Sequence, residues 1–178
     1  MSFKILKKNY AIGMASIKIN QTIKYSLAFI VLITTSFTNK SVSADEAPAP
    51  IFGDITIGRK FSPDPLTVSG MSGGKIPGKQ VSGRSESPTG PCVGFFDPEP
   101  DHTLKLTSKF DYLKLQVRSP EDTTMVIKGP GGSWCNDDLD GKNPGIVGEW
   151  LPGKYQIWVG SYHKNKYLPY RLQVSETR

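Results

Sequence analysis

Apolar residues that recur at every second position constrain the fold of this chain more than any other feature of its sequence. The pattern occupies residues 104–106, 113–117, 155–159 and 168–174, and turns rich in Gly and Pro separate these runs. A period of two is typical of strands with one buried face and one solvent-exposed face. Because no run beyond residue 45 sustains the 3.6-residue period of a helix, the sequence predicts an all-β fold, a single antiparallel β-sandwich that is jelly-roll-like.

Residues 1–44 have the features of a secretory signal peptide. They contain six Lys and no carboxylate, an apolar stretch at 25–37, and small residues at Val42-Ser43-Ala44 that suit a cleavage site. A membrane-spanning helix needs about 20 apolar residues, whereas this stretch has 13. We therefore expect a cleaved signal, a flexible lead-in at 45–52 and a sandwich domain at 53–178. The protein is expected to be periplasmic or extracellular.

The formal charge of +6 originates in the predicted signal. Removing its six Lys from the 22 Lys and Arg leaves 16, which balances the 16 Asp and Glu. A chain without net charge has no global field that attracts nucleic acid or anionic lipid. We therefore expect no nucleic-acid partner and no membrane-spanning role for the part beyond residue 44.

The first half of the domain is irregular, and the two cysteines connect it to the second half. Residues 69–91 are rich in Gly, Ser and Pro and predict a long loop or an irregular edge. Cys92 and Cys135 form an even pair in an exported chain, which predicts a disulfide. The alternative is two free, buried thiols.

A run of acidic residues is the candidate metal site. Asn136, Asp137, Asp138 and Asp140 precede Gly141 and match the first half of an EF-hand loop, but the twelfth position is Val147 instead of Glu. An EF-hand is therefore rejected. Two interpretations stay open, a Ca²⁺ site on a β-sheet loop and a solvated turn rich in Asp and Asn.

A serine hydrolase is the weakest interpretation of the sequence. Residues 70–74 match G-x-S-x-G around Ser72, yet a triad also needs a base and an orienting acid. The only histidines, His102 and His163, both follow the serine in the sequence. We expect each of them at the surface or in a turn, and neither as a catalytic base. We expect no catalytic activity.

Aromatic residues gather in the last third of the chain and supply the candidate binding residues Trp134, Trp158 and Tyr162. Aromatic side chains stack on sugars or anchor protein partners, but they also fill sandwich cores, which is the favoured interpretation for the group. Strand alternation places Trp158 on the face opposite Ile157 and Val159. It is exposed if that face is open, and buried if both faces of the sheet are covered.

Several stretches beyond residue 100 share a family pattern. They are Phe110–Arg118, the strand at 119–127 with its leading acidic residues, the Gly-Lys-Tyr strand at 151–160 and the closing Tyr-x-Leu-x-Val at 170–174. Residues 100–175 thus resemble the bacterial pre-peptidase C-terminal domain. The disulfide and the Gly-rich first half are not general features of that family. Their combination is typical of stand-alone secreted bacterial proteins, cyanobacterial ones included, and we expect no protease domain before this one.

The resemblance implies a sandwich without catalysis of its own. Some members of the family bind Ca²⁺, and by this analogy Asp122, Asp137, Asp138 and Asp140 are the positions to test. The sequence predicts a non-catalytic binding module that recognises a protein or an envelope polysaccharide, with Ca²⁺ as its candidate cofactor. The alternative is a structural or assembly subunit of an envelope or extracellular complex, and a small hydrolase using Ser72 is the remote one.

Overall fold

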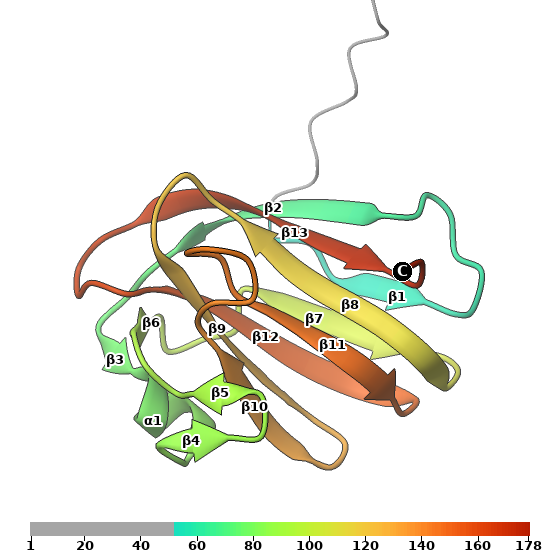
Figure 1. Cartoon of the computed structure of the whole chain (residues 1–178), viewed down its shortest axis with the longest axis horizontal. Coiled ribbons are helices and arrows are strands. Elements are labelled where there is room, and N and C mark those ends of the chain that lie inside the picture. Colours follow the sequence, from blue (N-terminus) through green and yellow to red (C-terminus); the bar gives the residue numbers. More distant parts are fainter. Residues whose placement is uncertain (1–51) are drawn as a thin grey trace, which may run out of the picture. The chain divides into compact units, whose positions relative to one another are not determined.

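The computed structural model describes residues 52–178, which form two large β-sheets packed face to face and a separate two-stranded sheet (Figure 1). The predicted signal at 1–44 and residues 45–51 of the predicted lead-in lie outside the described residues. The all-β sandwich expected from the alternation is confirmed, and α1 (Gly78–Ser82) is the single helix among the described residues. Within residues 52–178, no helix is long and apolar enough to cross a membrane.

The first sheet has four antiparallel strands in the order β11-β8-β13-β2. Their bounds are β11 (Gly145–Trp150), β8 (Phe110–Arg118), β13 (Leu168–Ser175) and β2 (Leu66–Ser72). The strand β13 lies between β8 and β2, and all seven residues of β2 pair with it. Its alternating side chains therefore sit in register with those of both neighbours, which fixes what each face of this sheet presents.

The second sheet is built around β12 (Gly153–Ser161), which pairs with three strands. Its members are β12, β1 (Ile55–Ile57), β7 (His102–Leu106), β6 (Phe95–Phe96), β3 (Ile76–Pro77), β9 (Thr123–Gly129) and β10 (Gly132–Asn136). All pairs are antiparallel except β1 with β7. Pro130 and Gly131 connect β9 to β10, and the φ of +96° at Gly131 is one that glycine adopts without steric cost.

The main hydrophobic core fills the space between the two sheets. The core consists of the inward-pointing side chains of the alternating runs, so the inward positions predicted from the period of two are confirmed. The core residues with no exposed surface are Leu104, Leu113, Leu115, Val117, Met125, Ile127, Ile157, Leu172 and Val174.

The segment predicted as a loop at 69–91 is more structured than expected. Its first four residues belong to β2, and the remainder contains β3, α1, β4 (Glu86–Ser87) and β5 (Gly90–Pro91). These short elements gather beside β9 and β10 (Figure 1), and α1, β4 and β5 contact those strands. The segment covers the outer face of the second sheet, and the predicted disulfide between Cys92 and Cys135 is confirmed there.

This covering corrects the expectation for Trp158. As the alternation predicts, its ring lies on the face opposite Ile157, but that face is not open to solvent. Trp158 is 6% exposed and belongs to a second apolar cluster with Phe96, Val126 and both cysteines. The sheet is covered on both faces, so Trp158 is a core residue and not an exposed binding residue.

Candidate functional site

Three carboxylates meet where two loops of the sandwich approach each other. Asp122 lies between β8 and β9, while Asp137 and Asp138 follow β10. One carboxylate oxygen from each residue lies within 4.8 Å of the others. Hard oxygen ligands at this spacing are the type that Ca²⁺ prefers.

Two of these carboxylates carry buried oxygens that lack a hydrogen-bond partner within residues 52–178. They are Oδ1 of Asp122 and Oδ1 of Asp137. Burial, reinforced by the charges of Asp138 and Asp122, raises the pKa of Asp137 to about 6. Unpaired buried oxygens and mutual repulsion are both relieved by a bound cation or by protonation.

The two loops that hold these acids are joined by Asn143. Its Oδ1 accepts a hydrogen bond from the Ser119 N–H at 2.9 Å, and its Nδ2 donates to the Ser119 carbonyl at 3.2 Å. A backbone hydrogen bond from the Thr123 N–H to the Lys142 carbonyl, at 3.1 Å, adds a second connection. Hydrogen bonds between the two loops therefore fix the relative positions of the acidic residues.

The other two predicted metal ligands have different partners. The Asn136 side chain donates to the Thr89 carbonyl at 2.8 Å and accepts from the Gly145 N–H at 2.9 Å, so it holds the ends of the acidic loop together. The Asp140 carboxylate forms an ion pair with Arg118. Of the five predicted ligands, the structure brings together Asp122, Asp137 and Asp138.

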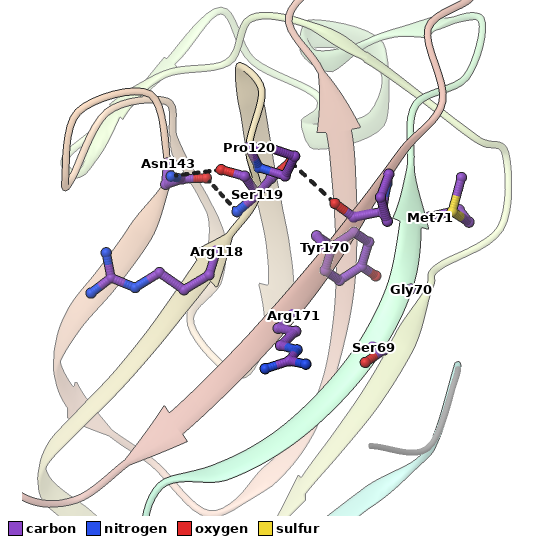
Figure 2. A pocket seen from close by; sticks show the side chains of 10 residues that line it. Ser69, Gly70, Met71, Arg118, Ser119, Pro120, Asn143, Tyr170 and Arg171 are labelled. Carbon is purple, nitrogen blue, oxygen red and sulfur yellow. Dashed lines mark hydrogen bonds between the residues drawn. The ribbon is translucent and has the colours of Figure 1, made fainter. Parts of the chain in front are cut away.

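A groove of about 530 Å³ lies beside these loops, on the outer face of the four-stranded sheet. Ser119, Pro120 and Asn143 form one side, and side chains from β2, β8 and β13 line the rest, as Figure 2 shows. This groove could not be predicted from the sequence. Its residues lie on three strands that are distant in sequence, and only the outward positions of the alternation hint at a shared surface.

The predicted aromatic binding residues occupy three different environments. Trp134 is half-buried and lines a smaller cleft of about 290 Å³ with Trp150 and Tyr155. Trp158 is buried, as described above. Tyr162 is 44% exposed, and its N–H donates to the Asp122 carbonyl at 3.2 Å, which places it next to the acidic cluster.

The residues of the predicted hydrolase motif have structural roles. The Ser72 hydroxyl is buried and hydrogen-bonds the Ser161 hydroxyl at 3.2 Å. His102, expected at the surface or in a turn, is instead buried in β7, and its Nε2 lies 2.7 Å from the Tyr170 hydroxyl. The motif's first glycine, Gly70, lies under the Tyr170 ring, where a Cβ would come within 2.3 Å of the hydroxyl. Close packing accounts for this glycine without any nucleophile.

These observations define the chain as a disulfide-bonded, all-β sandwich with a loop-borne acidic cluster. No protein-family model matches it. An uncharacterized protein of Synechococcus elongatus is 30% identical over 105 residues, which cover 57% of this chain and 78% of that protein. The chain belongs to the same family as this cyanobacterial protein.

Among solved structures, the chain is similar to the pre-peptidase C-terminal domain of a collagenase from Bacillus anthracis. The two are 15% identical with a TM-score of 0.40, and the match covers 74% of this chain and 100% of that domain. That domain belongs to the family that residues 100–175 resemble in sequence.

Proposed function

We propose that this protein is a non-catalytic, exported interaction module whose loop end is stabilised by Ca²⁺. The observation that carries the proposal is the convergence of Asp122, Asp137 and Asp138 within 4.8 Å, with two buried oxygens unpaired within residues 52–178. These three side chains would hold the ion, which would supply the positive charge that their environment lacks.

The partner is a protein or an envelope polysaccharide. The groove supports an interaction role, because Ser119 and Asn143 connect it directly to the loops that carry the acids. A cation that fixes these loops also fixes one side of the groove, and a rigid surface binds with a smaller loss of conformational entropy. The pairing of Ser72 with Ser161 supports the absence of catalysis.

The test is a thermal melt of the purified protein, with its disulfide intact, in EDTA, in millimolar Ca²⁺ and in millimolar Mg²⁺. A ligand that binds the native state alone raises stability as RT ln(1 + [L]/Kd). We expect Ca²⁺ to raise the Tm by several degrees and Mg²⁺ to have little effect. An unchanged Tm in Ca²⁺ would overturn the metal site.

Two variants separate the acidic cluster from general charge effects. Asp137→Asn should abolish the Ca²⁺-dependent rise, because it removes a charged ligand at the centre of the cluster. Asp111→Asn is the matched control, because this exposed carboxylate pairs with Lys109 and is not part of the cluster. Loss of the Ca²⁺ response in both variants would contradict the assignment of the ion to this site.

A further inference from the structure

The outer face of the four-stranded sheet displays cations. Leu113, Leu115 and Leu172 point into the core, so the residues that alternate with them point outward. In this way Arg118 and Arg171 are exposed on β8 and β13 (Figure 2). Chain neutrality predicts no such concentration of charge, because it describes the total and not its distribution.

The two arginines lie directly opposite each other. Arg171 and Arg118 are paired in the antiparallel register, an arrangement of like charges that destabilises a strand pair. Arg118 is neutralised by Asp140, whereas Arg171 has no ion pair with any carboxylate of residues 52–178. Its charge is therefore available to an external anion.

Apart from Arg118, the hydrogen-bonding side chains next to Arg171 are uncharged. Its partner on β2 is Ser69. The next outward residue of β13 is Gln173, which pairs with Gln116 of β8 and with Thr67 of β2. The groove described above begins beside Arg171 and continues past the apolar surfaces of Met71 and Pro169. The face thus combines several neutral polar groups with two cations, Arg171 and Lys114, that have no ion pair within the described residues. Of these two, Arg171 borders the open, partly apolar groove.

We propose that this groove binds an acidic polysaccharide, with a carboxylate of the polymer paired to the Arg171 guanidinium. Ser69 would hydrogen-bond the sugar hydroxyls, and the apolar face of a sugar ring would lie against Met71 and Pro169. The proposal rests on the proposed function and selects polysaccharide from its two partner classes. The groove favours this choice because the Ser69 and Ser119 hydroxyls that line it can donate to and accept from sugar hydroxyls.

The second sheet provides a matched comparison of charge without a groove. Lys154 and Lys105 are exposed and directly opposed on β12 and β7, and neither has an ion pair within the described residues. If net positive charge alone attracted polyanions, this pair would bind them as well as Arg171 does. The groove and the planar, bidentate geometry of the guanidinium are what distinguish the Arg171 site.

The experiment measures binding of fluorescein-labelled polygalacturonate to the purified protein in EDTA at near-physiological salt. Neutral dextran and poly-L-glutamate serve as the comparison polymers. We expect Arg171→Gln to weaken polygalacturonate binding about tenfold, because it removes a charge-assisted hydrogen bond. Met71→Glu, which places a carboxylate in the groove, should abolish binding, while Lys154→Gln should leave it unchanged.

Three results would overturn the proposal. They are no binding of polygalacturonate by the unaltered protein, equal weakening by Lys154→Gln and Arg171→Gln, and binding of poly-L-glutamate as tight as that of polygalacturonate. The last result would assign the groove to an acidic peptide. Because EDTA removes Ca²⁺ and the thermal test of the metal site contains no polymer, failure of either proposal is distinguishable from failure of the other.

Discussion

Cys92, just after β5, is bonded to Cys135 of β10, and their Cα atoms lie 5.1 Å apart. The bridge fastens the segment that covers Trp158, and all three residues belong to one buried cluster. The disulfide therefore holds the covering segment on the outer face of the second sheet. It also restricts the conformations of the unfolded chain.

Removing this bridge should be costly. For a sequence separation of 43 residues, the chain-entropy relation gives a loss of about 4 kcal/mol in the double variant Cys92→Ala/Cys135→Ala. Urea unfolding followed by Trp fluorescence measures the change. Reductant should destabilise the unaltered protein and leave the double variant unaffected. A loss below about 1 kcal/mol would contradict the role assigned to the bridge.

The sandwich could be predicted from the sequence because each strand carries its own evidence. The alternation around Leu115 and Leu172 assigns inward and outward positions without knowledge of any partner strand. The burial of Trp158 could not be predicted in this way, because the residues that cover its side chain belong to a Gly-rich segment without hydrophobic periodicity. His102 was misplaced for a similar reason, since its partners Tyr170 and Gly53 are distant in sequence.

The candidate site was predictable in part. Asp137 and Asp138 stand next to each other in the sequence, but Asp122 joins them only through the pairing of loops, and only the family resemblance indicated it. Asn136 and Asp140 fit the same sequence pattern, yet tertiary partners engage their side chains. Sequence spacing within one loop cannot distinguish residues whose side chains meet at a site from residues whose side chains hold the loop in place.

Gly70 should tolerate no side chain. A Cβ there would lie 2.3 to 2.8 Å from three atoms of the Tyr170 side chain. The ring is buried, and its hydroxyl is hydrogen-bonded to His102, so it has little freedom to move. Gly70→Ala is expected to lower the free energy of unfolding by about 1–3 kcal/mol. Gly148→Ala is the control, because no atom of residues 52–178 lies within 4 Å of the Cβ it would add.

Asp101 should make stability fall as the pH rises. Its carboxylate accepts a hydrogen bond from the Val159 N–H at 2.7 Å, but burial is the larger effect and raises its pKa from 3.8 to about 7. An acid with a higher pKa in the folded state contributes its full stability below pH 4, and this contribution is lost as the pH rises to 7. The loss is on the order of 3 kcal/mol.

Asp101→Asn isolates this contribution, because the amide oxygen can still accept the Val159 hydrogen bond and cannot ionise. The variant should lack the decline between pH 4 and pH 7, so the difference between the two stability curves should widen across that interval. Urea unfolding at several pH values measures both proteins under identical conditions. A constant difference from pH 4 to pH 8 would show that Asp101 has an ordinary pKa in the folded protein.

The Ca²⁺ response itself should depend on pH through Asp137. Burial and two neighbouring carboxylates raise the pKa of this residue to about 6, so protons compete with Ca²⁺ below that value. The rise in Tm caused by Ca²⁺ should be complete at pH 8 and should disappear as the pH falls through 6 towards 5. Asp111→Asn should follow the same profile, because Asp111 pairs with Lys109 outside the cluster. A Ca²⁺ response of equal size at pH 5 and pH 8 would mean that Asp137 is not a ligand.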